Sequence, residues 1–126
     1  MLNHKSTKNL SAGEALSALG LTDAAANRYY YALYQAAVHR LTVLGWTPGR
    51  FESGAVQWSH TMIYLNIFLV RRRRSDRALF DAMRNMRERA DYSDRSVEAG
   101  SLAAHVAAVR EFVEEGTEWG IRESRN

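Results

Sequence analysis

The sequence predicts an all-helical domain that folds as an up-and-down bundle of four to five helices. Three observations point to this class. The 126 residues include a single proline, β-branched residues do not alternate with polar ones, and apolar residues recur at spacings of three and four. Short loops would join the helices, as in known bundles. The length fits one domain over residues 1–126, with an ordered core over about 11–116.

The first half of the chain is expected to form three helices. A short helix over 11–19 would end at a glycine, and Thr22 or Asp23 would cap a long helix that runs to Leu44. A loop with glycine and proline follows, and a third helix is expected over 55–70. Apolar residues nearly encircle that third helix, so it would be central or buried against a second copy of the chain.

The second half is expected to form two helices. Ser75 or Asp76 would cap the fourth helix, and a loop around 93–96 would lead into the fifth. Each predicted helix has an apolar stripe that would face the core. The stripe of the long second helix consists of Ala26, Tyr30, Leu33, Ala37, Leu41 and Leu44.

Charge and composition narrow the function classes. The net charge is only +3, but residues 71–95 hold nine arginines against five acidic residues, while residues 96–126 hold three arginines against six. An anionic partner would therefore be drawn to one end of the molecule. No cysteine is present, and neither an apolar run of membrane-spanning length nor a signal-peptide core is found. We therefore expect a cytoplasmic, soluble protein without membrane association.

The segment MRERADYSD, over 86–94, places charged residues and an aromatic residue at the expected end of the fourth helix. Arg84, Arg87 and Asp91 would share one face at spacings of three and four. Guanidinium groups bind phosphate in bidentate fashion, so the segment could hold a phosphate. Helices also commonly end in such charges, which leaves a purely structural reading open.

A second cluster lies on the long second helix, where Tyr29, Tyr30, Tyr31 and Tyr34 crowd one turn beside Arg28. Aromatic residues at helical spacing are usually core residues. Three consecutive tyrosines cannot all face inward, however, because successive helical residues point about 100° apart. At least one hydroxyl is therefore expected at a cleft, an interface or the solvent.

Metal and cofactor chemistry find little support in the sequence. No histidine has another histidine three or four residues away, and the pair Asp91 and Asp94 more often caps a helix or pairs with arginine than binds magnesium. No phosphate-binding glycine loop and no nucleophile elbow occur. We expect no metal and no cofactor. Of the four histidines, His60 is the best candidate for a functional role.

Two separated segments resemble the HEPN family, the higher eukaryote and prokaryote nucleotide-binding domains. NRYYYALYQAAVHRL, over 27–41, is similar to the family's tyrosine-pair helix, and RERADYSD, over 87–94, is similar to its arginine-alanine-aspartate-tyrosine signature. Ser59 and His60 look like the family's serine-histidine step. The resemblance covers about residues 16–116 and implies a dimeric helical bundle. Its branch is often encoded beside a minimal nucleotidyltransferase in toxin-antitoxin pairs.

Many HEPN proteins carry a metal-independent ribonuclease site in which a histidine follows the arginine by four to six residues. Here the arginine maps to Arg87, and Tyr92 stands at the position of that histidine. An unperturbed tyrosine titrates near ~10 and exchanges protons poorly at neutral pH. If the chain is a ribonuclease, Arg87 and Tyr92 would carry the reaction, and His60 would supply the missing titratable group.

Two functions follow as hypotheses. The first is a homodimer that binds RNA or a nucleotide, as the toxin-like member of a pair with a separate nucleotidyltransferase. The binding residues would be Arg28, Tyr30, Tyr31, Arg84, Arg87, Arg89 and Asp91. The second is a non-catalytic interaction protein, in which the arginines and carboxylates form a structural network between subunits.

Overall fold

A computed structural model describes residues 4–45, 49–50, 56–57, 59, 63, 74–92 and 96–115. Apart from one short antiparallel pairing, these residues form helices and their connections, which confirms the predicted all-α class. The helices are α1 (His4–Ala18), α2 (Thr22–Val43), α4 (Arg74–Tyr92) and α5 (Ala99–Glu114). The pairing joins β1 (Gly49–Arg50) to β2 (Val56–Gln57).

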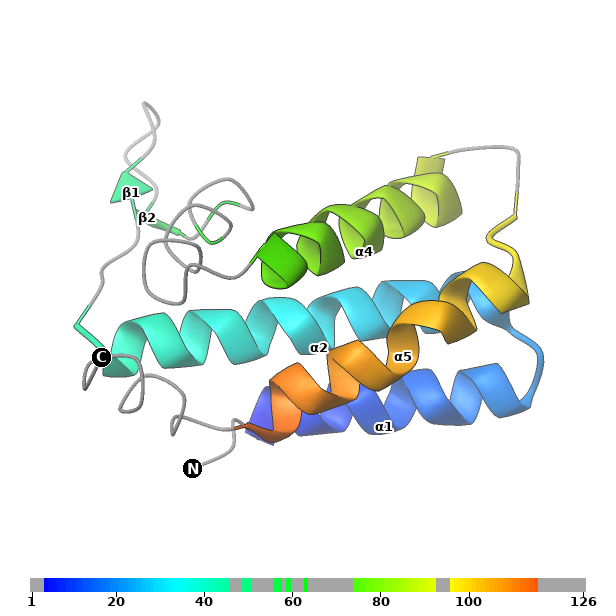
Figure 1. The fold of residues 1–126 in the computed structure, drawn as a ribbon, viewed down its shortest axis with the longest axis horizontal. Coiled ribbons are helices and arrows are strands. Elements are labelled where there is room, and N and C mark those ends of the chain that lie inside the picture. The colour runs from blue at the N-terminus through cyan, green and yellow to red at the C-terminus, as the bar shows by residue number, and fades with distance from the viewer. Residues whose placement is uncertain are drawn as a thin grey trace.

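Helix α2 is the central element of the bundle. In Figure 1 it lies between α4 and α1, and α5 crosses in front of it at an angle. Each described helix runs opposite to the described helix before it (Figure 1). No described helix combines the length and the apolar character that a membrane span requires.

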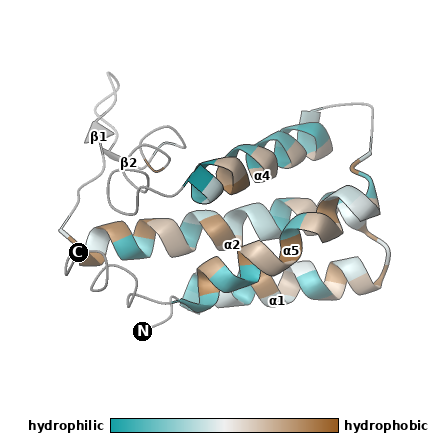
Figure 2. Ribbon diagram, in the orientation of Figure 1, coloured by the Kyte–Doolittle hydropathy of each residue, from teal (hydrophilic) through white to brown (hydrophobic). Residues whose placement is uncertain are grey.

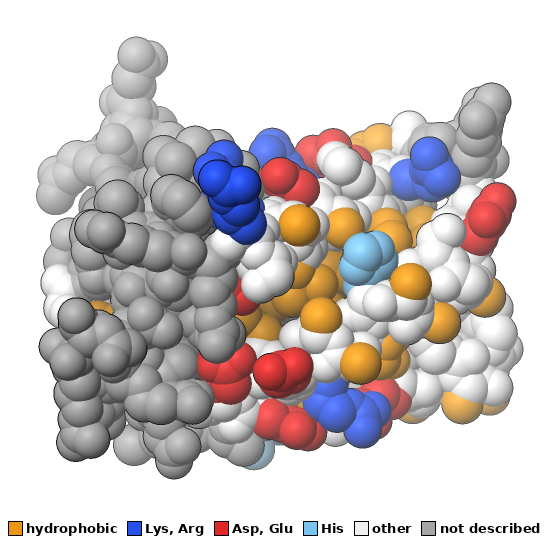
Figure 3. Space-filling model, viewed as in Figure 1, with side chains coloured by type: hydrophobic (Ala, Val, Ile, Leu, Met, Phe, Trp, Pro, Cys, Tyr) orange, Lys and Arg blue, Asp and Glu red, His pale blue; other side chains and the backbone are white. Residues whose placement is uncertain are grey.

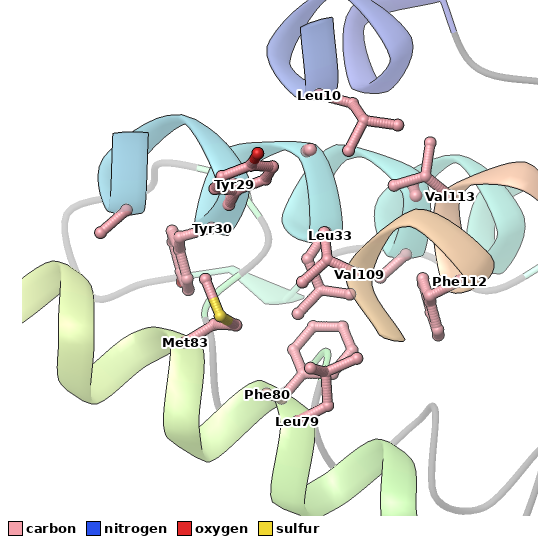
Figure 4. Close-up of a cluster of buried hydrophobic side chains, with 14 of the residues drawn as sticks. Leu10, Tyr29, Tyr30, Leu33, Leu79, Phe80, Met83, Val109, Phe112 and Val113 are labelled. Carbon is pink, nitrogen blue, oxygen red and sulfur yellow. The ribbon is translucent and has the colours of Figure 1, made fainter. Parts of the chain in front are cut away.

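The hydrophobic core surrounds α2 and draws on all four helices. Figure 4 shows Tyr29 on the α1 side of α2, near Leu10, and Tyr30 turned toward Met83 of α4. Phe80 of α4 and Phe112 of α5 meet edge to face, with ring centroids 5.6 Å apart. The outer side of α4 is hydrophilic (Figure 2), which fits a helix that covers the core from one side.

The predicted apolar stripe of α2 is buried except at its end. Ala26, Tyr30, Leu33, Ala37 and Leu41 are 0–3% exposed. Leu44 follows the helix and is 39% exposed, so its assignment to the core was wrong. The next residue, Gly45, has a φ of 91°, and this left-handed conformation turns the chain away from the helix axis.

A buried arginine ties α2 to α5. Arg40 is 2% exposed, donates a hydrogen bond from Nη2 to the carbonyl oxygen of Val113 at 3.0 Å, and lies with its guanidinium carbon 4.8 Å from the ring centroid of Phe112. Burial lowers its pKa to about 10, and the charges of Glu115 and Asp76 oppose that shift. Asp76 is also buried, so α2, α4 and α5 meet around a group of opposite charges.

Several expected boundaries and caps differ from the structure. The first helix begins at His4 instead of residue 11, and Val56 and Gln57 lie in β2, so the helix predicted over 55–70 cannot begin at 55. Ile63 is helical and fully buried, whereas most of the predicted segment lies outside the described residues. Short polar stretches carry little periodic signal, which explains the misplaced boundaries.

The caps expected for α2 and α4 were also wrong. The residue that caps α2 is Leu21, without a side-chain hydrogen bond, and α4 already begins one residue before Ser75. Asp23 has another role: its Oδ1 accepts a hydrogen bond of 2.7 Å from the backbone N–H of Val97. A carboxylate expected to cap its own helix instead fixes the connection between α4 and α5.

Candidate functional site

The two segments that the sequence singles out come together where α2 packs on α4. Their contacts define an α2/α4 cluster, made of Asn27, Tyr30, Tyr31, Arg87 and Asp91. On each helix the residues stand three or four positions apart, so each set shares a face. Residues 60 positions apart in the sequence thereby form one site.

Arg87 is the centre of the cluster. Its guanidinium carbon lies 5.2 Å from the ring centroid of Tyr30 and 5.2 Å from that of Tyr31. The two rings meet edge to face, with centroids 5.4 Å apart, so they form a corner around the cation. Contacts of this kind attract a guanidinium to the ring faces and fix its position.

The carboxylate of Asp91 holds the other side of Arg87. Nε of Arg87 lies 3.4 Å from Oδ2 of Asp91, one helical turn further along α4. The amide nitrogen of Asn27 donates to both carboxylate oxygens, at 3.4 and 3.3 Å. Nε itself is buried and has no hydrogen bond of good geometry in the described part of the chain. The side chain of Arg87 remains 26% exposed, so its charge is reachable from solvent.

Burial raises the pKa of two tyrosines, one in the cluster and one beside it. Desolvation raises the pKa of Tyr30, and the nearby charge of Arg87 only partly opposes this. Burial also raises the pKa of Tyr34, whose ring centroid is 6.2 Å from those of both Tyr30 and Tyr31. The hydroxyl of Tyr30 therefore stays protonated at neutral pH and can donate a hydrogen bond, but it cannot act as a base.

Two further predicted arginines lie beside the cluster. Arg84 precedes Arg87 by almost one turn and pairs with Glu88 at 3.2 Å on the exposed surface of α4. Arg28 on α2 donates to the side-chain oxygen of Asn9 at 3.4 Å. Arg28 also lines a pocket of about 250 Å³ between the start of α2 and the end of α4, together with Asn27 and Asp91. Both cations are available at the edges of the cluster.

The structure does not bring Arg89 into this group. Arg89 lies on the opposite side of α4, in a pocket with Val97, Glu98 and Ser101. Two residues along a helix correspond to a rotation of about 200°, which explains why neighbours in the motif face different ways. Arg87 and Arg89 therefore cannot hold the same phosphate within one chain.

The other expected catalytic residues are also apart from Arg87 or outside the described residues. Tyr92 is the last residue of α4 and is 78% exposed, and its ring makes no contact with Arg87. His60 lies outside the described residues. Within the described ranges, no three His, Cys, Asp or Glu side chains stand close enough together to hold a metal ion. The cluster as described has binding groups and no proton carrier suited to neutral pH.

Asn27 is a member of the cluster that sequence reasoning missed. Its amide supports Asp91, which in turn positions Arg87. The only signal in the sequence was its spacing of three and four residues before Tyr30 and Tyr31, which places it on the same face of α2.

No protein-family model matches the chain, and no curated protein matches it either. The likeness to the HEPN family therefore stays a prediction that rests on the two motifs. What the cluster can do chemically follows from its geometry alone.

Proposed function

We propose that this protein binds RNA or a nucleotide at the α2/α4 cluster and is the toxin-like member of a pair with a minimal nucleotidyltransferase. The observation that carries the binding step is the corner of two tyrosine rings and one carboxylate that holds Arg87, partly exposed, in a fixed orientation. A positioned guanidinium loses less side-chain entropy when it binds a phosphate than a free one does. Arg28 and Arg84 add positive charge at the edges.

The aromatic rings suit the same ligand. Tyr31 is partly exposed, and bases of single-stranded nucleic acid stack on aromatic side chains. A phosphate on Arg87 and a base on Tyr31 would use neighbouring groups of one surface. Cleavage is the weaker part of the proposal, because the carboxylate beside Arg87 is paired with it and burial raises the pKa of the Tyr30 hydroxyl.

A salt titration of binding to a short single-stranded RNA and to a mononucleotide tests the proposal. Affinity should fall steeply as salt rises from about 50 to 200 mM, since phosphate contacts release counterions. Arg87→Ala should weaken binding at low salt by roughly 10-fold to 100-fold, the value of one charge-assisted contact. Arg89→Ala is the matched control, because it removes the same charge from the opposite side of α4.

Two outcomes would contradict the binding proposal. One is an absence of binding by the wild-type protein at low salt. The other is an equal loss in Arg87→Ala and Arg89→Ala, which would indicate general attraction to a basic surface. Thermal unfolding of each variant separates lost binding from lost folding.

The second candidate function is a non-catalytic interaction protein, and one observation favours it. The charge of Arg87 is already paired with Asp91, which Asn27 supports, so the network can serve structure alone. This pair forms within one helix, whereas the sequence suggested a network between subunits. Under this function, Arg87→Ala would lower stability while the wild type binds no RNA or nucleotide.

The proposal includes a homodimer and a separate nucleotidyltransferase. Sedimentation of the purified chain at tens of micromolar tests the dimer, and a monomer would contradict it. Co-purification with the product of a neighbouring nucleotidyltransferase gene tests the pairing.

A further inference from the structure

A second hollow in the described part of the molecule lies away from the α2/α4 cluster. It is a groove of about 920 Å³ between α5 and the end of α1, with α2 as its floor. We call it the α1/α5 groove. Figure 1 shows its origin: α5 crosses the bundle at an angle, so it approaches α1 near its own end and diverges from it toward its beginning.

Small and apolar side chains make up most of the groove. Ala99, Ala103 and Ala107 recur every four residues along the wall on α5, and all three are exposed. The buried ring of Tyr29 forms part of the floor. Alanines at this spacing let another helix approach closely, because they leave no long side chains in between.

Charge is confined to one end of the groove. Glu111, Glu114 and Glu115 line it where α5 ends. Among the described residues that line the groove, the only basic one is Arg110, which already pairs with Glu14 of α1. Figure 3 shows acidic side chains beside a basic one near the lower edge of this face and hydrophobic side chains across its middle. The groove is thus apolar along its length and acidic at one end.

We infer that the α1/α5 groove is a docking site for an amphipathic helix of another protein, with a small apolar face and Lys or Arg residues at one end. Shape and charge select this occupant. The wall from Ala99 to Glu114 extends for about 22 Å, which is four turns of helix. An apolar face would cover the alanines, and cations at one end would meet the exposed carboxylates of Glu111 and Glu114. The inference does not depend on RNA or nucleotide binding.

The probe is a synthetic 16-residue peptide of about four helical turns, with alanine and leucine on one face and three lysines at one end, labelled for fluorescence anisotropy. A second peptide with glutamates in place of the lysines is its control. We expect saturable binding of the lysine peptide at low salt, weakened at least ~10-fold by higher salt or by the glutamates.

Neighbouring alanines supply a matched pair of variants. Ala103→Arg fills the groove, whereas Ala104→Arg adds the same side chain to an exposed position that does not line it. Ala103→Arg should weaken binding of the lysine peptide at least ~10-fold, and Ala104→Arg should change the affinity for that peptide less than about twofold. Glu114→Gln should also weaken it, in a salt-dependent way.

Each contrary result overturns the inference. Three results would contradict a charged docking site: no saturable binding, equal binding of the two peptides, or equal effects of the two arginine variants. Self-association of the wild-type chain that Ala103→Arg abolishes and Ala104→Arg preserves would show that a second copy occupies the groove instead. Circular dichroism of both variants establishes that they fold.

Discussion

Replacing Arg40, the buried arginine of α2, tests which contacts between α2 and α5 stabilise the bundle. Arg40→Ala removes a charged donor from the carbonyl of Val113, a cation from the ring of Phe112 and most of a long buried side chain. It also removes a positive charge that interacts electrostatically with the buried Asp76. Breaking a buried ionic contact by removing one partner costs about 3–5 kcal/mol, and we expect a loss of unfolding free energy in that range.

The pKa of Arg40 allows the charge to be separated from the volume. Burial lowers this pKa to about 10, which means that the fold disfavours the charged side chain by about 3 kcal/mol. Arg40→Ala and Arg40→Met both remove that charge and its cost, but only methionine keeps a long side chain that refills the space. We therefore expect Arg40→Met to be more stable than Arg40→Ala by about 2 kcal/mol.

Urea unfolding followed by circular dichroism measures both differences, provided that the slopes against denaturant agree. An Arg40→Ala protein within about 1 kcal/mol of the wild type would refute the structural role of Arg40. An Arg40→Met protein no more stable than Arg40→Ala would refute the reasoning about charge and volume.

Three further predictions test the bundle at other points. Asp23→Ala should lower the unfolding free energy by about 1–3 kcal/mol in urea titrations, because the backbone N–H of Val97 loses its acceptor; a value near zero would contradict this. Gly13→Ala should lower the melting temperature, because the added Cβ would stand 3.0 Å from the ring of Tyr29. Gly100→Ala should raise the melting temperature slightly, because the added Cβ meets open space. The reverse order of melting temperatures would contradict this prediction. Burial raises the pKa of Tyr30, so the contribution of Tyr30 to stability is complete below about pH 10 and is lost as the pH rises through the higher pKa of the folded state. Tyr30→Phe should therefore flatten the decline in unfolding free energy at high pH, and an unchanged slope would count against this prediction. Arg40 contributes in the opposite direction in both proteins, so its effect cancels in the comparison.

Helix content and the main core stripe could be predicted because they depend on local periodicity. The buried residues of α2 recur at three and four from Ala25 to Leu41, which is more than four turns and a strong signal. Phe80 and Phe112 were missed as core residues, because their burial depends on contacts between helices: the two rings meet edge to face, and Arg40 of α2 lies over Phe112. Burial that comes from a second helix leaves no mark on a single periodic pattern.

The sequence predicted most residues of the candidate site, but it did not predict how they are arranged in space. The sequence placed Arg87 and the tyrosines on separate helices, and their contact required knowledge of how α2 and α4 pack. Arg89 was grouped with Arg87 because the motif was read along the chain, whereas the helix separates the two around its axis. The α1/α5 groove left no signal at all, since it results from the angle at which α5 crosses the bundle.

The bond between Asp23 and Val97 has a consequence for following the protein by hydrogen exchange. Val97 lies outside the helices, so its N–H is protected by one carboxylate that is 74 residues distant in the chain and not by a helical ladder. That amide exchanges with solvent only when the connection between α4 and α5 separates from the start of α2. Its exchange rate is therefore a single-residue reporter of when the second half of the bundle detaches from the first.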